Sequence, residues 1–429
     1  MKTIKKAFMF CLILVCCSYF VIKAKTSLDF RVQGASASSS SETDLEKNAI
    51  SSEYRKYVAS KKAWHKETYG NEDYFPQGVK KEISKGSITQ TEDDANYTFQ
   101  VDASGFYNVY IDYTILDGYK SSMERMLLIN GEVPFSGADT LTFSRVWVDD
   151  LAKDKEFQTD KNGNQRKPQQ IEKSKLTNEP TKSSSYVKDY MGYETAPYKF
   201  YFEKDVEYTI TLRVSKEPMQ LDKVTLLSVV DTPNYSDYLD NLIQSTGLNP
   251  NNNITNQKTI WQAERSSGKS SPTLYPTTDR SSSKTTPFSY TKTYLNAIGG
   301  DNWKVLGDWI EWEFEVPADG YYNISMRAKQ NTIRGMYSSR IVYVDGEILF
   351  DELNDVQFSY ANKWQNVTLG NKDGDFLFYF KAGETHTIRM EVTMGQYSTL
   401  IERIQEAVTN LNTVYRQIIS YTTVSRRQL

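Results

Sequence analysis

The chain carries few of the side chains that bond-breaking chemistry requires. Its three cysteines, Cys11, Cys16 and Cys17, all lie near the N-terminus, and its two histidines, His65 and His386, are far apart in the sequence. Without other cysteines, a disulfide framework, a zinc ribbon and a cysteine nucleophile are excluded. His386 is expected at the surface and His65 has no evident partner, so the sequence also argues against a catalytic triad.

Carboxylates are the remaining candidates for catalysis. Glycosidases use two carboxylates held at a defined separation across the scissile bond. Asp308 and Glu311 are close in the sequence, but Glu311 and Glu313 alternate with apolar residues. This alternation places both glutamates on the solvent face of a strand. We therefore expect the chain not to be an enzyme.

The N-terminal segment has the pattern of an export signal. Lysines precede and follow an apolar run over residues 7–22, which is shorter than the roughly 20 residues of a membrane span. Residues 1–24 are therefore predicted to be a signal peptide or a lipoprotein signal. Three outcomes stay open: acylation of Cys17 in the lipobox-like residues 14–17, cleavage after Ala24 or after residues 35–37, and an uncleaved anchor. Each one places the remaining chain outside the cytoplasm.

Composition sets further limits. A chain of 429 residues has room for two or three domains. The 30 tyrosines, 19 phenylalanines and 7 tryptophans suit half-buried strands, and such rings can also stack on the apolar face of a sugar. A net charge of −3 gives no indication of nucleic-acid binding.

Two parts of the chain repeat one pattern. In each part an alternating strand meets a turn that ends in glycine, an aromatic strand follows, and two shorter blocks recur later in the same order. The matching pairs are residues 97–110 with 312–325, 128–132 with 343–347, and 198–204 with 376–382. A repeat of this length indicates two duplicated domains rather than a solenoid.

The pattern predicts a mainly β protein with two tandem β-sandwich (jelly-roll) domains. We expect a tether and short helix at residues 25–66, module 1 at 67–230, a linker at 231–257, module 2 at 258–396 and a C-terminal helix at 397–429. Within the last segment, apolar residues from Leu400 to Ile419 recur at helical spacing. Such a stripe must bury its face, so this helix is predicted to be a docking element or a truncated junction.

Module 2 resembles the family 6 and family 35 carbohydrate-binding modules, which are galactose-binding-like β-sandwiches. The resemblance is carried by residues 261–264, 307–312, 316–322, 364–367 and 380–389. It implies that Glu264 helps to hold a structural calcium ion. It also implies that a sugar stacks on aromatic residues in the loops at one end of the sandwich, first Trp303 and Trp364 and then Tyr294.

One departure from that family counts against sugar binding. The family usually closes with an Asn-bearing strand that hydrogen-bonds the sugar. Here the corresponding residues 394–399 lead directly into the predicted C-terminal helix.

The whole chain also resembles the N-terminal region of the extracellular solute-binding proteins of bacterial sugar importers (ABC transporters). Residues 124–135, 160–168 and 216–219 carry this resemblance. It implies a cell-surface protein whose C-terminal helix contacts a solute-binding domain or transporter subunits.

Two functional hypotheses follow. The first is a non-catalytic extracellular protein that binds oligo- or polysaccharides as the N-terminal part of an importer's solute-binding protein. The second is a structural spacer or interaction module of a cell-surface receptor that binds no sugar itself. The altered closing segment and the apolar C-terminal helix favour the second hypothesis.

Overall fold

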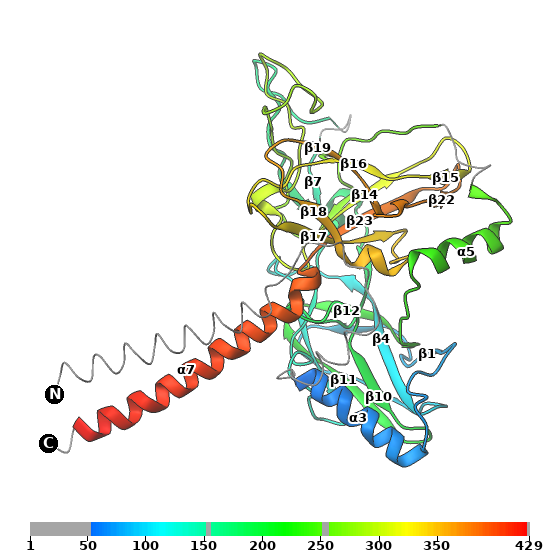
Figure 1. Ribbon diagram of the computed structural model, residues 1–429, viewed down its shortest axis with the longest axis vertical. Helices are drawn as coiled ribbons and strands as arrows, with labels where there is room; N and C mark the ends of the chain where they lie inside the picture. Colours follow the sequence, from blue (N-terminus) through cyan, green and yellow to red (C-terminus); the bar gives the residue numbers. More distant parts are fainter. Residues whose placement is uncertain (1–52, 152–155, 251–256, 427–429) are drawn as a thin grey trace. The chain divides into compact units, whose positions relative to one another are not determined.

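The protein is described by a computed structural model that covers residues 53–151, 156–250 and 257–426 (Figure 1). The predicted signal and Cys17 lie outside these residues. The described chain is mainly β, as the sequence predicts, with two tandem sandwiches. Within the described part, no helix combines the length and the apolar character that crossing a membrane requires.

Module 1 is a sandwich of two antiparallel sheets. The larger sheet contains β1 (Lys80–Glu82), β2 (Ile88–Gln90), β4 (Gly105–Ile115), β9 (Lys182–Tyr186), β10 (Lys199–Phe202) and β12 (Met219–Ser228). The smaller sheet has the order β3 (Ala95–Phe99), β11 (Tyr208–Lys216), β5 (Met123–Ile129), β6 (Leu141–Phe143). Alternate residues of both sheets meet in one buried core, as expected for packed sheets.

Module 2 has a large sheet and a layer of short strand pairs around a second core. The sheet runs in the order β18 (Val356–Ser359), β17 (Tyr337–Val344), β23 (His386–Thr393), β14 (Trp309–Phe314), β13 (Gly268–Lys269), β7 (Trp147–Asp149), β8 (Gln170–Glu172). The pairs are β15 (Gly320–Tyr322) with β22 (Phe378–Phe380), β16 (Ser325–Ala328) with β19 (Gln365–Thr368), and β20 (Gly370–Asn371) with β21 (Gly374–Asp375).

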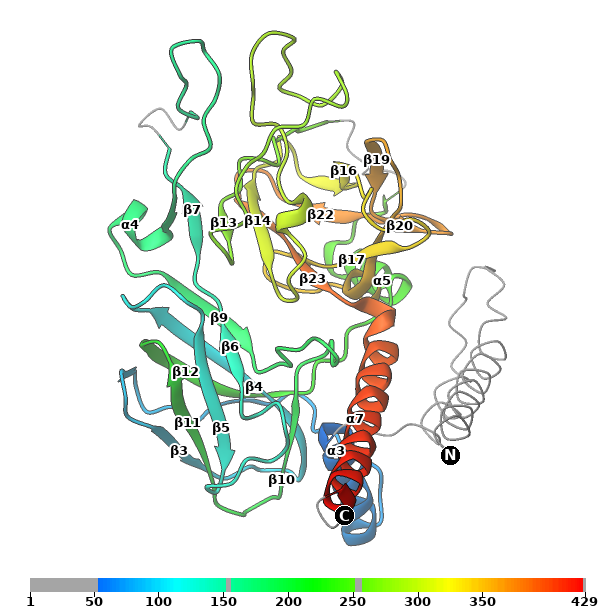
Figure 2. The same ribbon diagram turned by 90° about the vertical axis from the view of Figure 1, so that its left-hand side faces the viewer.

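Two strands of the large sheet come from the sequence range expected for module 1. β7 and β8 pair with each other, and Trp147 of β7 also pairs with Lys269 of β13 (Figure 2). The ammonium of Lys269, which is fully buried, lies 2.7 Å from the carboxylate of Asp149. The sequence range of module 1 thus contributes two strands to the large sheet of module 2. The expected boundaries at residues 230 and 258 do not describe this exchange.

The helices lie before, within and after the strand segments. α3 (Glu53–Tyr69) precedes module 1, α4 (Lys173–Thr177) follows β8, and α5 (Tyr235–Thr246) precedes module 2. The short 3-10 helices of the described chain are η1 (Gly300–Asn302), η2 (Asp351–Asp355) and η3 (Gly395–Tyr397). After β23 the chain passes through η3 into α7 (Ser398–Arg426), so the predicted replacement of a closing strand by a helix is confirmed.

The strand register shows that the two modules are copies of one plan. Gly105 lies opposite Phe202 in module 1, and Gly320 lies opposite Phe380 in module 2. The order β3–β11–β5 is likewise matched by β14–β23–β17. Because a slip of one residue would turn every side chain to the other face, this shared register preserves which residues form each core. The predicted duplication is confirmed.

The same hairpin turn also recurs in both modules. Asn130 and Asp345 have φ values of 52° and 50°, and each is followed by a glycine with positive φ, as in the tight hairpin turns that favour Asn-Gly and Asp-Gly. The side chain of Asn130 accepts the N–H of Thr209 at 2.8 Å. Asp345 accepts the N–H of Thr387 at 2.7 Å. The turn residue therefore ties each hairpin to the neighbouring strand.

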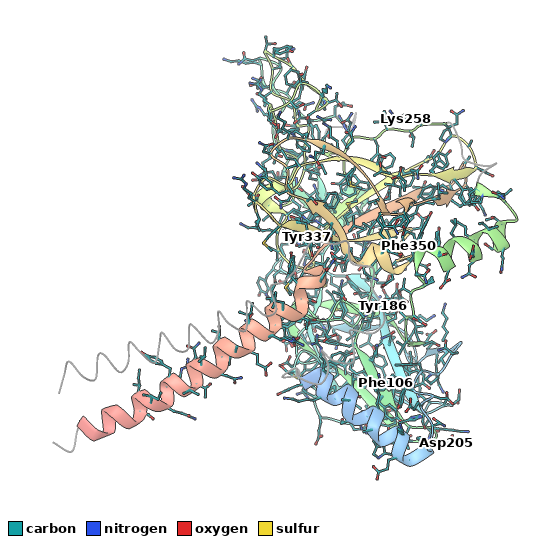
Figure 3. All side chains as sticks on the ribbon, viewed as in Figure 1. Phe106, Tyr186, Asp205, Lys258, Tyr337 and Phe350 are labelled. Carbon is teal, nitrogen blue, oxygen red and sulfur yellow. The ribbon has the colours of Figure 1, made fainter. Side chains whose placement is uncertain are left out.

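A tyrosine clamp, defined as one helix tyrosine and the sandwich groups it contacts, repeats as well. In module 1 the hydroxyl of Tyr54 on α3 accepts the N–H of Lys199 at 3.0 Å, and its ring lies 4.8 Å from that of Phe135. In module 2, the hydroxyl of Tyr235 on α5 accepts the N–H of Leu377 at 2.9 Å. The Tyr235 ring lies 5.0 Å from the ring of Phe350, which is labelled near α5 in Figure 3. Each preceding helix thus belongs to its sandwich, although the sequence assigned the helices to a tether and a linker.

Both histidines are buried, and the expectation of a surface position for His386 is wrong. The exposed fraction is 3% for His65 and 6% for His386. His65 Nδ1 lies 2.7 Å from the hydroxyl of Tyr201, and His386 Nδ1 lies 2.9 Å from the carboxylate of Asp345. The first contact joins α3 to β10, and the second joins β23 to the hairpin turn that follows β17.

Removal of one clamp tests whether the preceding helix stabilises its sandwich. Tyr54→Ala should lower the free energy of unfolding by about 3 kcal/mol, because a large buried aromatic side chain is lost. Urea unfolding followed by circular dichroism measures the change. Tyr119→Ala is the control, since Tyr119 is 95% exposed, and equal stability of the two variants would contradict the role of the clamp.

Candidate functional site

Trp364 lies in a polar cluster beside the short strand pairs of module 2. It directly precedes β19, and its ring is half-buried. The Lys329 ammonium, just after β16, lies 5.0 Å from the ring centroid. Lys329 also forms an ion pair of 2.5 Å with Asp279. One aromatic ring, one cation and one carboxylate are therefore brought together from three separate segments.

The carboxylate of Asp279 is held in its charged form. Partial burial alone would raise the pKa of this group, but hydrogen bonds from the Lys329 ammonium and from the hydroxyl and main-chain N–H of Ser281 keep the pKa well below its usual range. A carboxylate with several donors favours the ionised state. The cluster thus presents a fixed negative charge next to an aromatic surface.

Tyr294 lies near the same loop but contributes main-chain contacts. Its carbonyl oxygen accepts the hydroxyl of Thr278 at 2.8 Å, and the side chain of Asn296 accepts the N–H of Asp279 at 2.8 Å. These bonds fix the segment that carries Asp279. Tyr294 is thereby connected to the Trp364 cluster through the main chain.

Trp303 has a different environment. The guanidinium of Arg340 lies 4.3 Å from its ring centroid, its ring packs at 6.4 Å against Trp312, and its N–H donates to the carbonyl of Asp308 at 3.0 Å. Among the described residues, no hydrogen bond or ring contact joins Trp303 to Trp364 or Tyr294. The structure therefore does not gather the three predicted aromatics into one platform.

Glu264 is a buried carboxylate. Its exposed fraction is 2%, and burial raises its pKa to about 7 against the opposing effects of its own N–H and of Arg265. Calcium is usually bound by six to eight oxygen ligands. Within the described residues, Glu264 belongs to no group of three or more acidic, histidine or cysteine side chains that could hold a metal ion. The calcium site at Glu264 stays a prediction.

The two carboxylates considered for catalysis have separate partners. Asp308 accepts the hydroxyl of Ser270 at 2.9 Å and borders a polar hollow of about 370 Å³, where burial raises its pKa. Glu311 pairs with Arg389 at 2.7 Å. Each carboxylate is thus engaged with its own neighbour.

The sequence missed the polar half of the Trp364 cluster. Asp279 and Lys329 are far apart in the chain and neither belongs to a recognisable motif. Only the pairing of β16 with β19 and the course of the Ser/Thr-rich loop bring them to Trp364. No local sequence signal could have identified them.

Comparisons with known proteins give no family. Neither a family model nor a curated protein matches the chain. Among solved structures, the ANX2 ectodomain from Arabidopsis thaliana aligns at 11% identity over 75% of this chain and 86% of that chain, with a TM-score of 0.20. The description of the fold therefore depends on the strand pairing reported above.

Two further solved structures are carbohydrate-related. A Paenibacillus sp. cycloisomaltooligosaccharide glucanotransferase aligns at 10% identity, covering 78% of this chain and 50% of that chain, with a TM-score of 0.17. The CBM22-1-CBM22-2 tandem domain of Paenibacillus barcinonensis Xyn10C aligns at 9% identity, covering 74% and 87%, with a TM-score of 0.13. Likenesses at this level carry no conclusion about function.

The raised pKa of Glu264 predicts a pH-dependent stability. Because its pKa rises from 4.5 to about 7 on folding, the native state binds the proton more tightly, and the free energy of unfolding should fall as pH rises through this range. Glu264→Gln removes this effect, and the variant should be more stable than the parent by about 3 kcal/mol at pH 8 and equal to it at pH 4. Thermal unfolding at several pH values measures the difference.

The matched control is Glu315→Gln, which changes an exposed carboxylate. A constant difference between Glu264→Gln and the parent across pH would contradict the assignment. The same series with added Ca²⁺ tests the predicted metal role, because an ion held by Glu264 would stabilise the parent and not the variant.

Proposed function

We propose that the chain is a non-catalytic carbohydrate-binding protein and that the Trp364 cluster of module 2 contacts the saccharide. The observation that supports this proposal is the association of the half-buried Trp364 ring with Asp279 and Lys329. An aromatic face can cover the apolar face of a pyranose. The adjacent carboxylate and ammonium can accept from and donate to its hydroxyl groups.

The mode of binding needs no reacting group. Stacking on one ring with a few polar contacts gives dissociation constants on the order of micromolar to millimolar, or about −4 to −8 kcal/mol. Lys329 and Asp279 already satisfy each other, so a bound hydroxyl would insert between existing partners or add to them. Such a site positions a saccharide and does not activate it.

The wider setting proposed is the outside of a bacterial cell. The N-terminal pattern of residues 1–24 supports export, with Cys17 as the lipid attachment residue or with cleavage further along. The resemblance to solute-binding proteins of sugar importers supports a role as the N-terminal part of such a receptor. In that setting α7 would contact the solute-binding domain or transporter subunits.

Affinity electrophoresis in gels that contain soluble polysaccharides tests the binding site. Trp364→Ala should abolish retention, and Asp279→Asn should weaken it about tenfold, because a charge-assisted hydrogen bond to a sugar hydroxyl is lost. Tyr119→Ala, which removes an exposed ring of module 1, should leave retention unchanged.

Trp303→Ala separates the two predicted tryptophans. Because the Trp303 ring already packs against Arg340 and Trp312, this change should lower stability more than it lowers retention. Retention by the parent that survives Trp364→Ala would remove Trp364 from the site. A parent protein that no polysaccharide in a broad panel retards would overturn the proposed function.

The second candidate function is that of a structural spacer or interaction module, and α7 favours it. Its first turns contact module 1 through Glu402, which lies 3.2 Å from Arg55, and through Gln405, which accepts the hydroxyl of Tyr193. From Thr409 to Ser420 every residue is exposed, and Figure 1 shows the helix extending beyond the strands. The exposed apolar stripe consists of Leu400, Ile401, Ile404, Val408, Leu411, Val414, Tyr415, Ile418 and Ile419.

An exposed apolar stripe of this length should drive association. Another copy of the chain can supply such a surface, so size-exclusion chromatography with light scattering should show association that grows with concentration. Leu411→Glu combined with Ile418→Glu should weaken it at least tenfold, whereas Thr413→Glu, on the polar side of the helix, should not. A chain that stays monomeric at high concentration would contradict a contact role for α7.

A further inference from the structure

Among the described residues, module 2 has no strand that corresponds to β12, the last strand of module 1. β12 lies between β1 or β2 on one side and β4 on the other. Its side chains Leu221, Val224 and Leu226 are at most 1% exposed and complete the core. In module 2 the strands that correspond to β4 are β15 and β16, and in the described chain each of them has a single neighbour, β22 or β19.

The correspondence of β16 with β4 is fixed by a shared main-chain bond. Val187 N donates to Val109 O in module 1, and Leu369 N donates to Ile324 O in module 2, both at 2.9 Å. Alternate residues of an antiparallel strand present their main-chain groups to opposite sides. Ile324 therefore faces β19, and Asn323, Ser325 and Arg327 face the side that β12 occupies in module 1. We call this side, from Tyr321 to Arg327, the open edge.

Asn323 shows the consequence of the missing strand. In module 1, Asn108 donates to the carbonyl of Tyr198 at 2.9 Å and accepts the N–H of Val230, just after β12, at 2.8 Å. Asn323 keeps the first bond, to the carbonyl of Phe376 at 2.8 Å. Asn108 is 1% exposed, whereas Asn323 is exposed. The acceptor oxygen of Asn323 is thus presented where a further strand would donate.

Arg327 carries the charge at this edge. Its nitrogens Nη1 and Nη2 donate to Asn366 and Ser282, but its buried Nε has no acceptor within the described chain. The corresponding residue of module 1 is Asp112, which lies opposite Lys223 of β12. The charge on the strand is therefore reversed between the modules. A strand that fits module 2 would carry an acidic residue where β12 carries Lys223.

The neighbouring side chains also lack the cover that β12 provides. Ile111 of β4 is fully buried, whereas its counterpart Met326 is only partly buried against the core of module 2. An unpaired strand edge beside partly covered apolar residues is a template for an added strand.

We propose that the open edge of module 2 binds an extended segment of a partner protein, which adds as an antiparallel strand in the place of β12. The segment would alternate apolar residues over Ile324 and Met326 with an acidic residue opposite Arg327. Main-chain hydrogen bonds provide affinity in such strand addition, and alternate side chains provide selectivity. This proposal does not rest on the proposed saccharide binding at Trp364.

Synthetic peptides test the proposal on the full chain. The first peptide has the β12 sequence of residues 219–228, and the second has the same sequence with Lys223→Glu. We expect the second peptide to bind two- to fivefold more tightly, the range that a cross-strand charge pair supplies. Fluorescence anisotropy of labelled peptides measures both affinities. The Arg327→Glu protein should reverse the order of the two peptides.

Two controls separate strand addition from other binding. A peptide with Thr225→Pro lacks one main-chain donor and should lose binding, and Ser325→Pro in the protein should do the same, provided that its circular dichroism matches that of the parent. The proposal is overturned if neither the Lys223 peptide nor the Lys223→Glu peptide binds. It is also overturned if the peptide affinities do not follow the charge at residue 327. A chain that pairs with itself, and that Ser325→Pro converts to a monomer, would also overturn it, because a second copy would then occupy the edge.

Discussion

The tyrosine clamp is the interaction on which each half of this protein depends. Each sandwich has a main-chain donor, in β10 or just before β22, that requires an acceptor, and aromatic rings beside it that require cover. Tyr54 and Tyr235 meet both needs, because each ring covers aromatic residues while its hydroxyl accepts a strand N–H. The order of helix then sandwich is therefore the unit that was duplicated, and the short hairpins and the shared register follow within it.

The two copies have diverged at their edges and not in their cores. The cores keep the pairing of Gly105 with Phe202 and of Gly320 with Phe380, because a change of register would expose the apolar face of every strand. Module 1 closes with β12, while module 2 gains β13, β7 and β8 on one sheet and loses a strand on the other layer. Contact surfaces can change in this way while the folded core is preserved.

The surfaces of module 2 have different physical characters. At Trp364 an aromatic ring and fixed charges form a small polar platform suited to a hydroxyl-rich ligand. At the open edge, Arg327 and main-chain groups without a strand partner among the described residues are the basis of the proposed strand addition. On α7 an apolar stripe suits another apolar surface. The three surfaces lie on different elements, so variants at each of them can be tested separately.

The sequence by itself determined the mainly β pattern, the repeated blocks and the helical C-terminus, because each is encoded in short runs of neighbouring residues. It also indicated a short helix within residues 25–66, the range in which α3 begins. It could not show that Tyr54 and Tyr235 seal the sandwiches, that His386 is buried against Asp345, or that β7 joins the sheet of module 2. Those contacts join residues far apart in sequence and are set by packing. For the same reason the sequence could indicate Trp364 as a candidate, because it is an aromatic residue in a matching segment. Only the tertiary structure placed Asp279 and Lys329 beside Trp364 and packed Arg340 on the ring of Trp303.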